Sequence, residues 1–168
     1  ALINIQVLTI DTMEQTQIGL KDDVRKEVSN ILDKVLADEY ILYTKLRNFH
    51  WNVRGPHFNE YHKFFEEQYD KLIEYVDEIA ERQRMIGAFP KASLQEFLEL
   101  TQLKEVKEIL SAEEMIQQAL DDHETMIRTL RQMIEELGDL GDNGNEDFLI
   151  ELLQEHEKMA WMLRSMNS

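Results

Sequence analysis

Long stretches of helical periodicity, with few residues that would break them, are the feature that most constrains this fold. The 168-residue chain contains only six glycines and two prolines, and between them apolar residues recur at the spacing of amphipathic helices. We predict four long helices, over residues 20–52, 58–87, 112–137 and 145–166. Short glycine-containing segments join the first two and the last two helices, so each pair is expected to form an antiparallel hairpin.

The connection between the second and third helices is long enough to run the length of a bundle. Within it, residues 93–103 have the apolar spacing of a short helix. Four helices with one long crossover are typical of the ferritin-like fold. We therefore predict a single all-α domain over residues 1–168. It is a ferritin-like four-helix bundle with a short crossover helix and an N-terminal arm at residues 1–19. Gly87 is expected to end the second helix.

The composition limits both the chemistry and the partners of the chain. There is no cysteine, so a metal site would use histidine nitrogen and carboxylate oxygen, which suit iron, manganese or zinc. The formal charge of −16 disfavours phosphate backbones and anionic lipids and attracts cations. No apolar run approaches the ~20 residues of a membrane span, and the first residues lack a secretion-signal pattern. We expect a cytoplasmic protein that does not bind membranes.

Three of the five histidines fall in the stretch NFHWNVRGPHFNEYH, which surrounds the first predicted turn. His50 is near the end of the first helix and His62 about one turn into the second, so the hairpin places them at similar heights. Further along the second helix, Glu66, Asp77 and Glu81 share the face of His62, because successive residues are ~100° apart. Taken singly, a histidine near a helix end is ordinarily favoured by the helix dipole or hydrogen-bonded, and an acidic pair is ordinarily a solvated helix face. Their joint spacing favours a metal site.

A single chain cannot provide all the ligands of that site. His62 and Asp77 are fifteen residues apart, or ~22 Å along the helix, whereas metal ligands lie about 2.0–2.2 Å from the ion. If the second helix packs against its own copy across a twofold axis, His62 of one subunit meets Asp77 and Glu81 of the other. None of the histidines has a glutamate three residues before it. A conventional di-iron site inside one bundle is therefore not expected.

The segments NFHWNVRGPHF and YVDEIAERQRMIG, together with His62, resemble the signature of the Dps family, the starvation-type mini-ferritins. The similarity in helix order and length covers nearly the whole chain. The resemblance implies that His50 and His62 of one subunit, with Asp77 and Glu81 of its twofold mate, form a ferroxidase centre.

The resemblance carries further expectations. Glu66 would be an acid near the metal, and Trp51 an aromatic neighbour of the centre that intercepts radicals. The family forms hollow dodecamers that oxidise Fe(II), preferably with hydrogen peroxide, and store ferric mineral. Such a ferroxidase serves in iron storage and detoxification and protects against oxidative damage. Zinc or other divalent ions are further occupants of the same site.

Two other functions remain open on the sequence: a metal-binding cage without catalysis, and a chromosomal protein that protects DNA. DNA-binding members of the family generally use lysine-rich tails, whereas residues 1–19 contain no lysine or arginine. DNA binding is therefore not expected.

The acidic segment GDLGDNGNED precedes the last predicted helix and has two interpretations. Acids stabilise the first turn of a helix, and Asn143 or Asn145 is a suitable N-cap. The resemblance implies instead that Asp142, Asp147 and Glu151 line an acidic pore for iron entry at a threefold axis. The two roles are compatible.

The remaining histidines are given structural roles. His57 precedes the second helix without a partner at suitable spacing, so we predict a turn or surface residue. His123 and His156 fall on the apolar stripes of the third and fourth helices. They are predicted to be buried and hydrogen-bonded in the core.

Overall fold

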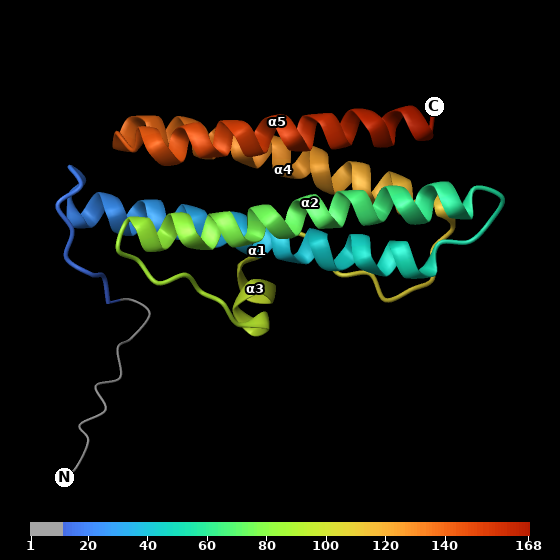
Figure 1. Ribbon diagram of the computed structural model, residues 1–168, viewed down its shortest axis with the longest axis horizontal. Coiled ribbons are helices and arrows are strands. Elements are labelled where there is room, and N and C mark those ends of the chain that lie inside the picture. The colour runs from blue at the N-terminus through green and yellow to red at the C-terminus, as the bar shows by residue number, and fades with distance from the viewer. Residues whose placement is uncertain (1–11) are drawn as a thin grey trace, which may run out of the picture.

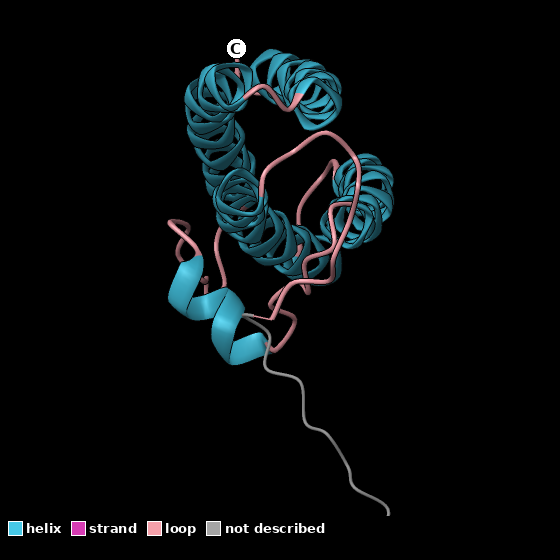
Figure 2. Cartoon of the chain, turned by 90° about the vertical axis from the view of Figure 1, so that its left-hand side faces the viewer, coloured by secondary structure: helices cyan, strands magenta, loops and turns pink. Residues whose placement is uncertain are grey.

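Five α-helices make up the regular structure of residues 12–168, the part of the chain that the computed structural model describes. They are α1 (Asp22–Asn52), α2 (Phe58–Met85), α3 (Leu94–Leu100), α4 (Ala112–Leu140) and α5 (Asn143–Met166). Helices α1 and α2 pack as one antiparallel hairpin, and α4 and α5 pack as another (Figure 1). The short α3 lies outside the four long helices, in the crossover (Figure 2). The predicted all-α four-helix bundle with a short crossover helix is confirmed. Residues 1–11 of the predicted arm lie outside the described residues.

The core is one continuous cluster of apolar side chains between the two hairpins. Each long helix contributes an apolar stripe, and the fully buried members include Leu32, Leu42, Phe49, Phe65, Ile79, Ile116, Leu130, Leu149 and Leu163. Burying one such side chain stabilises a fold by roughly 1.5–3 kcal/mol. The stripes therefore determine how each helix is rotated, and so which residues face outward.

The second hairpin is tighter than the sequence predicted. Helix α4 was expected to end at residue 137 but continues to Leu140, and α5 begins at Asn143, two residues earlier than expected. Leu137 is fully buried and holds the last turns of α4 against the core. Such packing outweighs the cost of about 1 kcal/mol for Gly138 inside a helix. Gly141 ends the helix with a left-handed φ of 78°.

Gly87 follows α2 with a φ of 83°, as its predicted role at the helix end requires. The N–H of Gly87 donates to the carbonyl of Arg84, and the N–H of Ala88 donates to the carbonyl of Gln83. These bonds satisfy carbonyl groups that the end of a helix would otherwise leave unpaired.

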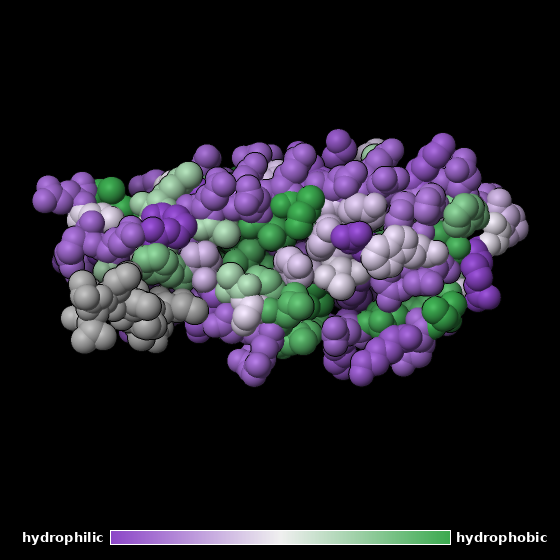
Figure 3. Space-filling model, turned by 60° about the horizontal axis from the view of Figure 1, so that its bottom comes forward, coloured by the Kyte–Doolittle hydropathy of each residue, from purple (hydrophilic) through white to green (hydrophobic). Residues whose placement is uncertain are grey.

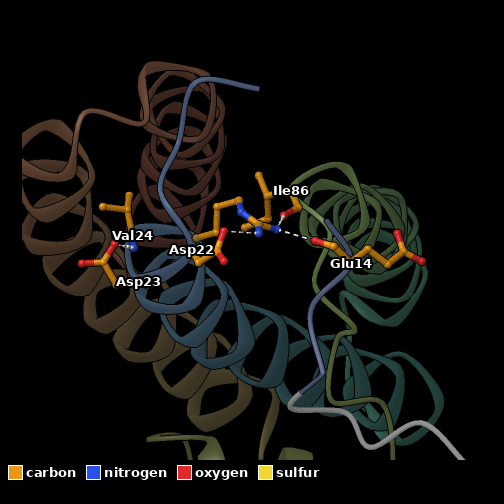
Figure 4. Close-up of polar contacts among 6 residues, drawn as sticks. Glu14, Asp22, Asp23, Val24 and Ile86 are labelled. Carbon is orange, nitrogen blue, oxygen red and sulfur yellow. Dashed lines mark hydrogen bonds and ion pairs between the residues drawn. The ribbon is translucent and has the colours of Figure 1, made fainter. Parts of the chain in front are cut away.

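Arg25 fastens the described part of the arm to the end of α2. Its side chain is only 1% exposed. Its Nη1 atom donates to the carbonyl oxygens of Glu14 (2.9 Å) and Ile86 (2.8 Å), and Nη2 donates to Asp22 (Figure 4). The N–H of Glu14 donates to the carbonyl of Gly87 at 2.8 Å. The arm, α1 and α2 therefore meet at a single buried guanidinium.

The surface around the crossover is only partly polar. Leu94, Leu98 and Ile109 are about half exposed or more, and Figure 3 shows apolar patches among hydrophilic side chains on the face turned toward the viewer. No helix within residues 12–168 is both long and apolar enough to cross a membrane.

Candidate metal centre

The first hairpin brings His50 and His62 into direct contact. Their rings are stacked, with centroids 3.8 Å apart and planes 13° from parallel. The Nδ1 atom of His50 lies 2.7 Å from the carbonyl oxygen of His62, and Nδ1 of His62 lies 2.7 Å from the carbonyl oxygen of His50. The two residues therefore hold each other in place through equivalent hydrogen bonds across the turn.

These bonds fix the tautomer of both rings. A carbonyl oxygen can only accept, so each Nδ1 carries the hydrogen, and in the neutral ring Nε2 then carries the lone pair. Neither Nε2 atom has a hydrogen bond within residues 12–168. Metal-binding histidines typically donate their other ring N–H in this way, which orients the ring and raises its basicity. The pair is thus prepared to bind a cation through Nε2.

Aromatic side chains surround the pair. The ring of Tyr69 meets His50 edge-on at 5.3 Å, and the ring of Phe58 stacks on His62 at 4.9 Å. His50 is only 8% exposed, whereas Phe58 is 43% exposed. Sequence reasoning missed both aromatic residues, although Tyr69 follows His62 by two helical turns and so shares its face.

Trp51 lies beside the centre but outside the core, with 62% of its surface exposed. The guanidinium of Arg47 stands 4.8 Å from the Trp51 ring and 5.6 Å from the Tyr69 ring. Its Nη1 atom also donates to the hydroxyl of Tyr43 at 2.8 Å. Arg47 therefore places a fixed positive charge between three oxidisable rings next to His50, and sequence reasoning gave it no role.

The acidic candidates lie apart from the histidine pair within one chain. Glu66, Asp77 and Glu81 are exposed on α2, which is unbroken from Phe58 to Met85. In residues 12–168 no three histidine or acidic side chains are close enough together to hold a metal ion. The predicted contribution of a twofold mate stays a prediction.

At the start of α5 the capping residue differs from the prediction. Asp142 is the N-cap, not Asn143 or Asn145. It is 5% exposed, and its carboxylate accepts from the backbone N–H of Asn145 (3.1 Å) and from its Nδ2 (2.6 Å). The Oδ1 atom of Asn145 in turn accepts from Nε of Arg82 at 2.7 Å. Both oxygens of Asp142 are thus occupied inside the chain.

The other two pore candidates are accessible. Asp147 and Glu151 are exposed and one helical turn apart on α5. Glu151 accepts a hydrogen bond from the Tyr75 hydroxyl at 3.4 Å. Burial raises the pKa of Tyr75, and the negative charges of Glu155 and Glu151 raise it further. Tyr75 therefore stays a neutral donor to this carboxylate.

The three remaining histidines behave as predicted. His57 is a surface residue at the start of α2, and its Nδ1 atom lies 3.6 Å from the carboxylate of Glu60. His123 and His156 are fully buried and hydrogen-bonded to each other.

Comparisons with known proteins agree with this architecture. A family model described as a ferritin-like domain matches residues 29–168. The chain is 45% identical to an uncharacterised low temperature-induced protein of a Nostoc species, over 91% of this chain and 87% of that protein. It is 39% identical to DNA protection during starvation protein 2 of Bacillus anthracis, over 84% of this chain and 97% of that protein.

A solved structure extends the agreement to three dimensions. The Dps protein of Vibrio cholerae O1, described as a member of a superfamily of ferritin-like diiron-carboxylate proteins, superposes with a TM-score of 0.88. It is 30% identical, and the match covers 94% of this chain and 99% of that one. From its sequence and its fold alike, the chain belongs to the Dps family of ferritin-like proteins.

Proposed function

We propose that the protein stores and detoxifies iron, oxidising Fe(II) with hydrogen peroxide at centres shared by two subunits. In each centre His50 and His62 come from one subunit, and Asp77 and Glu81 from its twofold mate. The observation that supports this most directly is the stacked histidine pair, whose Nδ1 atoms are occupied and whose Nε2 atoms carry free lone pairs. Two neutral imidazoles suit Fe(II), while carboxylates increasingly favour Fe(III), so the mixed set tolerates both states.

The proposed reaction balances with peroxide as the electron acceptor. Two Fe(II) ions each lose one electron, the O–O bond breaks, and two protons are taken up to give two water molecules. Four protein ligands leave coordination positions open for the oxidant. With so few ligands the ferric product is not trapped, and it moves to interior carboxylates, where it hydrolyses to mineral. Zinc and similar divalent ions would compete for the same ligands.

Glu66 and Trp51, which lie next to the histidine pair in the sequence or on α2, would support the reaction. Glu66 follows His62 by one turn and is exposed, so its carboxylate is available to a second ion or to the departing product. Trp51 would give an electron to any radical that escapes the centre. The Arg47 guanidinium over its ring would disfavour the radical cation, so loss of the indole proton would accompany that electron transfer.

The proposal requires an assembly, which we take to be a hollow cytoplasmic dodecamer. It is supported by the exposed face of α2 that carries Asp77 and Glu81, where Ile73 is also 36% exposed. The exposed apolar residues of the crossover add further surface for a second copy to cover. Asp147 and Glu151 would attract Fe(II) at the entry pores. Asp142 caps the same helix start, and its pore role stays a prediction.

The shared site is tested by complementation. The double variants His50→Gly/His62→Gly and Asp77→Ala/Glu81→Ala should each lose fast peroxide-dependent Fe(II) oxidation. Mixing them through disassembly and reassembly should restore part of the activity, because a hybrid dimer regains one complete site. Each variant reassembled alone is the control, and native mass spectrometry verifies the hybrids. Hybrids without recovered activity would refute the shared site.

Peroxide dependence decides between this function and a non-catalytic cage. If the wild-type protein binds Fe(II) but peroxide oxidises the iron no faster than in protein-free solution, the protein is a non-catalytic cage.

A further inference from the structure

A second group of histidines and a carboxylate lies in the middle of the bundle, away from the metal centre. Glu39 of α1, His123 of α4 and His156 of α5 are each 0% exposed. Nε2 of His156 is hydrogen-bonded to Oε1 of Glu39, and Nδ1 of His156 lies 2.7 Å from Nδ1 of His123. This buried triad runs from the first hairpin into the second, so it links the two halves of the bundle.

The triad is a line of donors and acceptors, not a cluster around one point. The imidazole of His156 stands in the middle and uses one nitrogen toward each neighbour. The outer atoms, Oε2 of Glu39 and Nε2 of His123, have no hydrogen-bond partner within the described residues. A metal ion needs donors that converge on it, so the particle shared along this line is a proton.

A carboxylate beside two neutral histidines would leave one uncompensated negative charge in the core, which is strongly unfavourable. One further proton removes that charge, and it can lie on Glu39, His156 or His123. On Glu39 it leaves both contacts as hydrogen bonds between neutral groups, and on His123 it puts the positive charge one ring further from the carboxylate. On His156 it places opposite charges in direct contact and makes both contacts charge-assisted hydrogen bonds.

The buried residues of the neighbouring helices supply no other positive charge to balance Glu39. The buried polar residues of α2 are Gln68 and Gln83, which carry no charge. Lys45 of α1 is already paired with Asp122 of α4, at 2.5 Å. Asp38, next to Glu39 in the chain, accepts hydrogen bonds from the crossover instead.

The charged residues that flank His156 along α5 lie outside the core: Glu155 is half-buried, and Glu157 and Lys158 are exposed. Tyr75 of α2 is held neutral beside Glu151 and Glu155, which are not buried in the core. Their charges favour a proton on the triad and do not replace one.

We propose that Glu39, His156 and His123 form a buried proton-binding site, with His156 held as an imidazolium between the other two, which makes the docking of the two hairpins sensitive to acid. The charged form of His156 is kept by Glu39. A second proton on His123 would place two positive rings at hydrogen-bond distance with no acceptor between them. The geometry of the triad therefore favours one shared proton and opposes a second.

The pH dependence follows from His123. Burial lowers the pKa of His123 well below its ordinary value of 6.5, and the charge of His156 lowers it further. The unfolded chain binds a proton at this residue below pH ~6.5, and the folded chain does not. The contribution of His123 to the stability of the fold is therefore fully present above that pH and is lost as the pH falls. Each pH unit below it raises the unfolding constant about tenfold.

The protonation state can be measured directly in the wild-type assembly, by solid-state NMR of protein carrying ¹⁵N-labelled histidine. At pH 7.5 one histidine should show two protonated ring nitrogens, and this signal should disappear in His156→Gln. At pH 5.5 one histidine should still be neutral. Five neutral rings at pH 7.5, or a His123 that titrates near pH 6.5, would overturn the proposal.

Unfolding measurements test the link to stability. In His123→Asn the side-chain oxygen can still accept from His156, but no ring is left to protonate. The decline of stability between pH 6.5 and 5 should become shallower by about one proton, a factor of about ten per pH unit. His57→Asn, at an exposed histidine, is the matched control and should keep the wild-type slope. Equal slopes in all three proteins would refute the acid-sensitive docking.

Discussion

His50 and His62 each donate Nδ1–H to the backbone carbonyl oxygen of the other residue, at 2.7 Å in both directions. The backbone of the hairpin therefore supplies the hydrogen-bond acceptor that orients each ring. Moving either helix end would disturb two imidazoles at once. The same arrangement explains why two histidines twelve residues apart can act as one ligand pair.

Replacing one member of the pair should weaken divalent metal binding without unfolding the bundle. In His62→Gln one Nε2 ligand is lost, and we expect at least about tenfold weaker binding of Co(II). Isothermal titration calorimetry and the visible spectrum of bound Co(II) measure the effect. His57→Gln removes an exposed histidine from the same turn and should bind as wild type does. Equal losses in the two variants would mean that the turn, not the ring of His62, holds the ion.

The acidic start of α5 should affect iron entry and not the chemistry. In Asp147→Asn/Glu151→Gln, Fe(II) uptake at low ionic strength should slow, because fewer negative charges attract the ion. The difference should shrink at high salt, where long-range attraction is screened. Stopped-flow oxidation at several salt concentrations measures this, with exposed Glu135→Gln on α4 as the control. Unchanged uptake at low salt would remove the pore role.

Asp142 should matter for stability through its capping bonds. Asp142→Ala removes the acceptor for the N–H of Asn145 at a buried helix start, and we expect a loss of about 1 kcal/mol or more in unfolding free energy. Asp147→Ala, at an exposed position of the same helix, should change it by less than about 0.5 kcal/mol. Unfolding of the two variants in guanidinium chloride measures both free energies. A larger loss in Asp147→Ala would contradict the assignment of the cap.

Gly87 and Gly141 have nearly the same φ, so replacing each by alanine distinguishes backbone strain from steric crowding. A Cβ at Gly87 would lie 2.7 Å from Nη1 of Arg25 and 2.9 Å from the carbonyl oxygen of Glu14, whereas one at Gly141 would meet nothing within 4 Å. Gly141→Ala should cost only the left-handed strain of about 1–2 kcal/mol. Gly87→Ala should cost more and should also speed proteolysis of the arm. Equal losses in unfolding free energy would mean that the buried guanidinium can move aside.

The sequence predicted the helices well because their periodicity is long and unbroken. It failed at the α4–α5 turn, where Gly138 suggested a loop. The burial of Leu137 against the other helices decides the outcome there, and a local pattern does not contain that contact. The choice of Asp142 over two asparagines as cap has the same origin, because it depends on where α5 begins.

Among the site residues, the sequence placed His50 and His62 together through hairpin geometry alone. It could not show their reciprocal bonds to the backbone, nor the ring of Tyr69 against His50, since both depend on helix rotation. It predicted His123 and His156 as buried and hydrogen-bonded, but not Glu39 as their partner. A glutamate on an otherwise apolar stripe was the available signal, and it becomes informative only once α1 and α5 are known to be neighbours.

The name of the Bacillus anthracis relative, DNA protection during starvation protein 2, associates that protein with DNA. We expect no useful binding to duplex DNA by this chain, because affinity comes largely from phosphate neutralisation by lysine and arginine. Residues 1–19 contain neither, and the formal charge of −16 is repeated in every copy. Near the C-terminus Arg164 is the one basic residue of the last ten, and it lies 3.5 Å from Glu124. A gel shift at low salt with a chelator should show free DNA, and adding Mg²⁺ tests whether a divalent ion can bridge acids to phosphates. A complex that persists with the chelator and is released by salt would reveal a basic surface that these residues do not provide.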